Sequence, residues 1–402
     1  MLDSNSEMSK PDRPEVPEEL QRKADLIIRD FRRLAEQYIH PWPINIAKKD
    51  ISIEHLRSKK DLLTGLDSRL LPRLQKQCVS LASLLHDPSH LREDPTLTLN
   101  LISETQTNLH LILCLLHSNL EEIFPENPPS PCQKNDQHFR EFKAYRLYQF
   151  DRSIRKGLKD GLQKLYQESI QIIEEFKLST KNHTNFVQEA SYSVNESIDI
   201  AIGWSKGPDL NFVWDIWQDT IVEFDSDLQE LMIQMSLEKI SDGNPEDPLS
   251  QPTIEFARSL IPIIKLTRVF FTKLFREESR KEKAEFFTTL CSDQLNSLNT
   301  SIDVISDYIF ALPIYIKNAH KFPRIVTTSG IIEGLNKAVS HFLSYFSIVK
   351  IDILPNLFPK PEDLLPQIQL QQWFDTWYEL FHDAFHIVHH AADSFDQISS
   401  SF

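Results

Sequence analysis

Glycine is scarce in this sequence: 8 of its 402 residues are glycine, roughly 2% against a usual share near ~7%. Tight β hairpins and phosphate-binding loops need glycine, because it adopts positive φ without steric cost. The shortage therefore argues against β-rich folds and nucleotide-binding loops. The Walker A, dinucleotide-binding, nucleophile-elbow and zinc-protease motifs are also absent, which removes the common enzyme classes that carry them. No catalytic residue and no cofactor site is predicted.

Cysteine is also rare, and none of the four cysteines forms a C-x-x-C pair: Cys78, Cys114, Cys132 and Cys291. The first ten residues carry no secretory signal pattern. We therefore expect free thiols in a reducing compartment, and an intracellular protein of the cytoplasm or nucleus.

Long uncharged apolar runs are missing, and so is an excess of basic residues. No run approaches the ~18–20 apolar residues that span a bilayer, so no membrane insertion is expected. The net charge of −15 disfavours nucleic acid and anionic membranes, because phosphate binding requires a basic surface. It favours other proteins as partners, basic ones among them.

Apolar residues recur instead at spacings of three and four, and most of the 23 prolines stand between these periodic stretches. This pattern is typical of amphipathic helices separated by proline-marked joints. The expected helices span residues 17–40, 52–85, 95–123, 139–178, 185–204, 209–240, 253–275, 282–311, 327–351 and 362–395. The sequence therefore predicts an all-α fold of two up-and-down bundles of long helices.

The domain boundary is predicted within residues 241–252. This stretch, SDGNPEDPLSQP, holds three prolines, a glycine and three acids, a composition typical of linkers. The expected organisation is a disordered N-terminus over residues 1–16, a bundle over 17–240, the linker over 241–252, and a second bundle over 253–402.

Histidines and acids cluster near the C-terminus, and the most prominent members at helical spacing are His382, His386 and His389. Carboxylate and histidine side chains at such spacing occur in helical metal sites. The apolar stripe predicted for this helix lies on its other side: Trp373, Trp377, Leu380, Phe381, Ala384, Val388 and Ala391. The three histidines therefore face away from the core. A solvated polar face is favoured over a surface metal site.

Apolar residues nearly encircle the segment IEFARSLIPIIKLTRVFFTKLF over residues 254–275. Such a helix is central to its domain or leaves apolar surface for a partner. We expect the central position, with Phe271 and Phe275 near the helix end as candidate partner-binding residues.

The same segment, followed by LNSLNTSIDVISDYIFAL, resembles the cyclin-D-binding protein family of acidic two-domain helical proteins. TNFVQEASYSVNESI and VWDIWQDTIVEFDSDLQEL are similar in placement to the end of that family's first domain. The resemblance implies cyclin-like partners and a role in restraining cell-cycle entry. It carries no catalytic residues.

The predicted function is therefore a non-enzymatic protein-interaction or regulatory scaffold. A structural adaptor built from helical bundles, of the vinculin sort, is the alternative hypothesis. A metal-dependent enzyme that uses the histidines of the last helix is the remote one. Bound metal would distinguish the enzyme, and a co-purifying cyclin-like or cytoskeletal partner would separate the first two.

Overall fold

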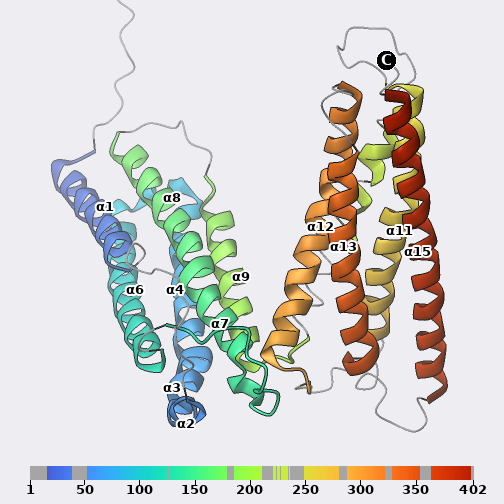
Figure 1. Cartoon of the computed structure of the whole chain (residues 1–402). Helices are drawn as coiled ribbons and strands as arrows, with labels where there is room; N and C mark the ends of the chain where they lie inside the picture. Colours follow the sequence, from blue (N-terminus) through green and yellow to red (C-terminus); the bar gives the residue numbers. More distant parts are fainter. Residues whose placement is uncertain are drawn as a thin grey trace, which may run out of the picture. The chain divides into compact units, whose positions relative to one another are not determined.

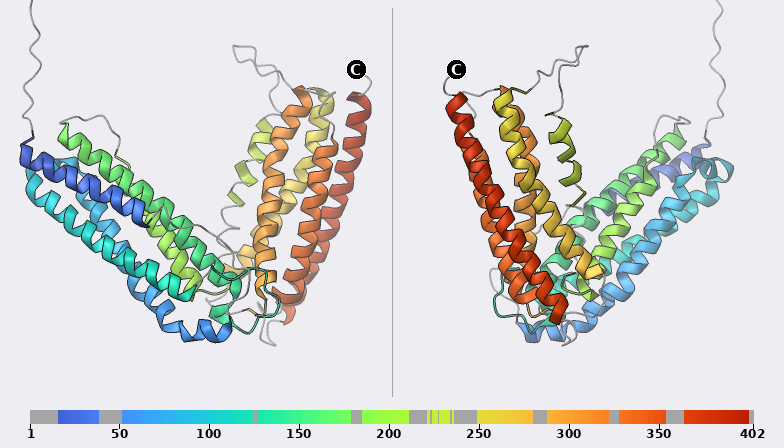
Figure 2. Two further views of the ribbon diagram at one scale, coloured as in Figure 1. Left: turned by 60° about the vertical axis from the view of Figure 1, so that its left-hand side comes forward. Right: turned by 90° about the vertical axis from the view of Figure 1, so that its right-hand side faces the viewer.

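Every regular element in the described part of the chain is a helix. The computed structural model describes residues 16–38, 52–124, 127–178, 185–210, 221–235 except 223, 227 and 234, 249–279, 288–321, 328–353 and 364–399. No strand occurs among these residues, which confirms the predicted all-α class. Within each part of the chain the helices run side by side as bundles (Figures 1 and 2).

The helices form two compact units, and each unit is discontinuous in sequence. Unit 1 contains Met1–Ser130 and Arg146–Lys206, whereas unit 2 contains Pro131–Tyr145 and Gly207–Phe402. The predicted boundary at 241–252 therefore differs from the observed one at Gly207. Residues 1–15 and 241–248 of the predicted N-terminal tail and linker lie outside the described residues.

Five long helices of unit 1 pack in a closed ring, in which each helix contacts its two neighbours. In order around the ring they are α1 (Glu18–Tyr38), α6 (Pro95–Ile123), α4 (Leu71–His86), α9 (Val187–Lys206) and α8 (Lys159–Lys177). Shorter elements complete the unit: α2 (Ile53–Ser58), α3 (Lys60–Gly65), α5 (Pro88–Glu93), α7 (Ala144–Arg152) and the π-helical turns at Leu66–Leu70 and Ser153–Leu158.

Amphipathic sequence places the unit 1 core inside this ring. Along α1, Ile27, Phe31 and Leu34 are buried, as the three-to-four spacing of the sequence predicts. Helices α8 and α9 approach closely at Gly161, where a Cβ atom would lie 3.1 Å from the backbone nitrogen of Val194. A side chain at this position would push the two helices apart.

Unit 2 is a second ring built from four long helices. They are α11 (Gln251–Ser279), α12 (Ser292–Lys321), α13 (Ser329–Ile348) and α15 (Leu364–Ser399), and a π-helical turn at Val349–Ile353 extends α13. α11 packs along α15, and α12 packs along α13. The prediction that α12 begins at 282 and ends at 311 is wrong. The helix begins at Ser292 and continues through Pro313.

Aromatic side chains fill the centre of unit 2, with Phe270 of α11 in the middle. Its ring centroid lies 4.5 Å from that of Trp377, 5.5 Å from that of Phe374 and 5.7 Å from that of Phe342. Phe270 is fully buried, so this face of α11 lies in the core, although α11 is one of four helices in the ring and Val269 on it is 43% exposed. Edge-to-face pairs of this kind add stability beyond the burial of their area.

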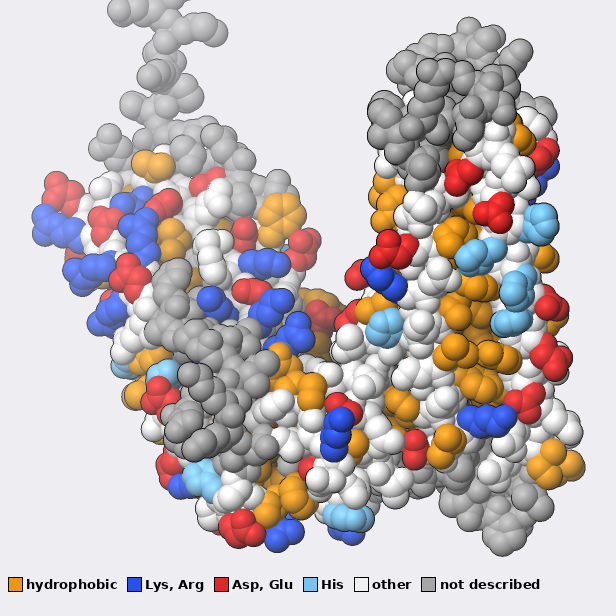
Figure 3. Space-filling view, in the orientation of Figure 1, with side chains coloured by type: hydrophobic (Ala, Val, Ile, Leu, Met, Phe, Trp, Pro, Cys, Tyr) orange, Lys and Arg blue, Asp and Glu red, His pale blue; other side chains and the backbone are white. Residues whose placement is uncertain are grey.

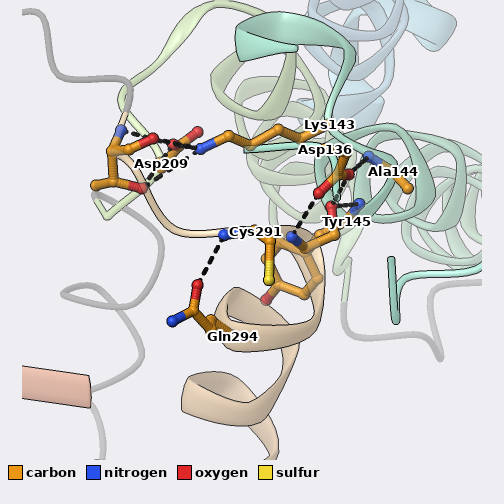
Figure 4. A network of polar contacts seen from close by, with 9 residues as sticks. Asp136, Lys143, Ala144, Tyr145, Asp209, Cys291 and Gln294 are labelled. Atoms are coloured by element: carbon orange, nitrogen blue, oxygen red, sulfur yellow. Dashed lines mark hydrogen bonds and ion pairs between the residues drawn. The ribbon is translucent and has the colours of Figure 1, made fainter. Parts of the chain in front are cut away.

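A buried polar network ties the Pro131–Tyr145 segment to unit 2 (Figure 4). The Asp136 carboxylate accepts hydrogen bonds from the backbone nitrogen of Ser292 at 2.8 Å and from that of Ala144 at 2.8 Å. Ser292 begins α12, so the carboxylate sits where the helix dipole favours a negative charge. Gln294 accepts a hydrogen bond from the Cys291 backbone nitrogen at 3.0 Å, one half of a capping box.

A second part of this network centres on a buried ion pair. The Lys143 ammonium donates to Asp209 Oδ2 at 2.5 Å and to the Thr288 carbonyl oxygen at 2.7 Å. The side chains of Lys143 and Asp209 are both fully buried. Buried charges need partners of this kind, because an isolated ion is costly to remove from water. These contacts explain why the segment groups with unit 2 although unit 1 follows it in sequence.

Candidate functional site

An apolar groove lies between α13 and α15. Its volume is about 220 Å³, and ten residues line it: Val339, Phe342, Leu343, Phe346, Trp377, Tyr378, Phe381, His382, Phe385 and His386. In the space-filling view an apolar stripe runs along this face of unit 2, with histidine side chains beside it (Figure 3).

Packed aromatic rings form the floor of this α13/α15 groove. The ring of Phe342 lies 4.9 Å from that of Phe381 and 5.6 Å from that of Trp377. All three side chains are buried, which makes the floor rigid. At the mouth, Leu343 is 41% exposed and Tyr378 is 37% exposed, so apolar surface remains open to a ligand.

Apart from its histidines, the charged side chains of α15 are all acidic. The sequence of α15 contains five carboxylates and neither lysine nor arginine. Asp375, Glu379, Asp383 and Asp393 are exposed. The cation contributed from the end of α13 is Lys350, whose ammonium lies 2.7 Å from Asp375. Helix α15 therefore carries net negative charge, but Lys350 pairs with Asp375 and the ten residues that line the groove include no carboxylate.

Two of the three predicted histidines lie at the groove mouth. His382 and His386 are exposed, and their ring centroids are 4.4 Å apart. His389 is half-buried and packs against Phe385, with ring centroids 4.5 Å apart. No group of three or more histidine, cysteine or acidic side chains with metal-binding geometry occurs among the described residues. His382 and His386 thus line the edge of an apolar groove, whereas the half-buried His389 departs from the predicted solvated face.

One member of the predicted apolar stripe of α15 does not face inward. Leu380 is 53% exposed, because it lies one position before the buried seam residue Phe381. Trp377, Ala384 and Val388 are buried as expected.

The two candidate docking residues of α11 have different outcomes. Phe271 is fully buried, with ring centroids 5.9 Å from those of Phe342 and Tyr345. This position corrects the expectation that Phe271 contacts a partner, since the core already occupies all of its surface. Phe275 lies within α11, but its side chain is outside the described residues.

A polar hollow between α12 and α13 brings a serine and a histidine together. Ser301 Oγ lies 3.2 Å from His341 Nδ1. Six uncharged polar residues and His341 line this hollow, and no described carboxylate does. Because a serine nucleophile needs an oriented base and an oxyanion site as well, the pair fits polar helix packing better than catalysis.

Sequence reasoning missed the α13 wall of the groove. Phe342 and Phe346 lie in the predicted helix 327–351, but the sequence does not show which neighbouring helix leaves them uncovered. One signal was available, because Leu343 adds an apolar residue beside that face.

Two family models match the chain, one in each half. A "Domain of unknown function (DUF8723)" matches residues 59–206, and a "Domain of unknown function (DUF8721)" matches residues 208–390. The joint between the two matches coincides with the division at Gly207. No helix in the described part of the chain is long and apolar enough to cross a membrane. Neither the curated proteins nor the solved structures provide a match to this sequence.

Proposed function

We propose that this chain is a non-enzymatic protein-interaction scaffold whose α13/α15 groove binds an amphipathic helix of another protein. The open aromatic groove is the observation that carries the proposal. Helix-in-groove recognition uses apolar anchors at positions i, i+3, i+4 and i+7 that enter such a hollow. Two parallel ridges of side chains from α13 and α15 provide the walls that a third helix needs.

The size of the groove supports anchor side chains as its ligand. Small-molecule pockets usually enclose ~300–1,000 Å³, whereas this groove holds about 220 Å³. A volume of this size accepts one or two large apolar side chains. Exposed Leu343 and Tyr378 extend the apolar surface beyond the hollow itself, which suits a ligand that continues along the groove.

The charge distribution supports a basic helix as the occupant. Helix α15, one wall of the groove, has four exposed carboxylates and no lysine or arginine. The whole chain carries a net charge of −15. Lysine or arginine residues flanking the apolar anchors would therefore be attracted to the rim, and acidic ones repelled.

The test uses two synthetic helical peptides with the same apolar stripe, one flanked by lysine and the other by glutamate. Binding to the full-length protein is followed by fluorescence anisotropy. The lysine peptide should bind, and both Leu343→Asp and Tyr378→Asp should abolish binding. Leu380→Asp is the matched control, because Leu380 is exposed on α15 but does not line the groove. Equal binding by all variants, or no binding of the lysine peptide, would contradict the proposal.

The natural partner can be captured by a photo-crosslinking amino acid at position 343. The same probe at position 380 supplies the background. A cyclin-like protein captured at 343 alone would support the cell-cycle role that the sequence resemblance implies. Capture of the same proteins at both positions would argue against the groove as the binding surface.

A further inference from the structure

Two histidine side chains of α15 give the α13/α15 groove a charge that depends on pH. Of the ten residues that line the groove, His382 and His386 are the two whose charge changes between about pH 5 and pH 8. The other eight are aliphatic or aromatic and stay uncharged in this range. Both histidines are exposed, and Figure 3 shows histidine side chains beside the apolar stripe of unit 2. The pH of the solution therefore sets the charge at the edge of the groove.

The two imidazole rings lie close together and are held by aromatic neighbours alone. Their centroids are 4.4 Å apart. The ring of Tyr378 lies 6.3 Å from that of His382, and the ring of Phe385 lies 6.4 Å from that of His386. No described residue forms a hydrogen bond or an ion pair with either imidazole. Protonation therefore breaks no contact in the described part of the chain, and it acts on the groove rather than on the fold.

The charged side chains near this pair on the neighbouring helices already have partners. On α13, Glu333 and Lys337 pair with each other at 2.9 Å. At the other end of that helix, Lys350 lies 2.7 Å from Asp375 of α15. On α11, the Lys273 ammonium lies over an indole ring of α15, 5.8 Å from its centroid. The other charged or titratable neighbours belong to α15 itself: Glu379, Asp383, His389, His390 and Asp393.

We propose, on the basis of the function proposed for this groove, that protonation of His382 and His386 weakens binding of the basic helix. Neutral imidazoles leave the carboxylates of α15 to attract lysine or arginine residues of that helix. Protonated imidazoles repel the same residues from a closer position, because the groove lining contains both histidines and no carboxylate. Binding is therefore strongest above the range in which imidazole titrates, and the groove releases its ligand as the pH falls through that range.

The test measures binding of the lysine-flanked peptide to the full-length protein by fluorescence anisotropy at about pH 8 and about pH 6. Both values lie above the isoelectric point of about 5.4. At low ionic strength the dissociation constant should rise by at least about threefold at the lower pH. A peptide with the same apolar stripe flanked by glutamine should change by less than about 1.5-fold, because it carries no charge for the histidines to repel. Circular dichroism at both pH values checks that the protein keeps its helices.

Three variants assign the effect to the histidine pair. In His382→Gln/His386→Gln, the ratio of the two dissociation constants should fall to about one, whatever the affinity at the higher pH. His390→Gln is the matched control and should keep the wild-type ratio, because His390 is exposed on α15 but does not line the groove. His382→Lys carries a permanent charge, so at about pH 8 it should bind the lysine peptide more weakly than the wild type does.

The possible outcomes separate this regulation from the function itself. Absence of binding of the lysine peptide at both pH values would contradict the proposed function and the regulation together. Equal affinity at the two pH values would overturn the regulation alone and leave the groove as a binding site. A pH dependence that persists in His382→Gln/His386→Gln, or that the glutamine peptide shares, would also overturn it, because its origin would then lie outside the repulsion between these histidines and the ligand.

Discussion

Removal of the Asp209 carboxylate is the most direct test of the buried network in unit 2. Asp209 Oδ2 accepts hydrogen bonds from Lys143 Nζ at 2.5 Å, from the Thr288 backbone nitrogen at 2.8 Å and from the Thr288 hydroxyl at 2.9 Å. In Asp209→Ala the buried ammonium keeps two oxygen atoms of Thr288 and loses its counter-charge. The backbone N–H of Thr288 loses its acceptor as well.

The expected loss of stability in unit 2 follows from these contacts. Breaking a buried ion pair by removing one partner costs about 3–5 kcal/mol, and an unsatisfied buried N–H adds to this cost. We therefore expect Asp209→Ala to destabilise unit 2 by about 4 kcal/mol, equivalent to roughly a thousandfold change in its unfolding equilibrium. The double variant Lys143→Met/Asp209→Leu should recover most of this loss, because it leaves no buried charge.

Hydrogen exchange with mass spectrometry measures the protection of backbone amides in unit 2 separately from those in unit 1. Amides of α12 should lose about three orders of magnitude of protection in Asp209→Ala, while those of α6 in unit 1 keep theirs. Two results would refute the reasoning. One is a loss below about 1 kcal/mol in the single variant. The other is a double variant as unstable as the sum of its single changes, because the two side chains would then not be coupled.

Three further predictions concern Tyr166, the cysteines and Gly161. Tyr166→Phe should leave the free energy of unfolding unchanged or raise it by up to about 1 kcal/mol in a urea titration, because its buried hydroxyl has no hydrogen-bond partner among the described residues. A thiol reagent at pH 8 should modify the two exposed cysteines within minutes and spare Cys78 until the protein unfolds, because burial raises the pKa of the Cys78 thiol to about 12. Gly161→Leu should lower the free energy of unfolding by about 1–3 kcal/mol, since the new side chain meets the Val194 backbone; an unchanged melting temperature would contradict the close approach of α8 and α9.

Local sequence patterns predicted most helices well, because each needs only its own periodicity and end signals. α6 begins at Pro95 after Asp94, whose side chain accepts a hydrogen bond from the Leu97 backbone nitrogen at 3.0 Å. The long helix near the C-terminus was recognised in the same way. Pro313 misled the prediction for α12, since proline usually ends a helix, but here the helix continues to Lys321.

The domain division could not be predicted from local patterns. It depends on contacts between residues far apart in sequence, such as Asp136 with Ser292 and Lys143 with Asp209. The composition of residues 241–252 predicted the domain boundary there. The observed division between the two units lies instead at Gly207, where the composition is inconspicuous. The groove could not be predicted for the same reason. The sequence identifies the apolar faces of α13 and α15, but the uncovered space between Phe342 and Phe381 depends on how closely the helices pack.

The inserted segment of unit 2 has a consequence during protein synthesis. Unit 1 is complete once Lys206 leaves the ribosome, but Asp136 must wait for Ser292, which is 156 residues further along the chain. At ~5–20 residues per second this wait lasts roughly 8–30 s. Throughout this wait Asp136 lacks its α12 partner, and the charged segment Pro131–Tyr145 interrupts a unit whose residues are already complete. We therefore expect unit 1 to fold co-translationally around an unfinished loop, and unit 2 to close only after α12 has been translated.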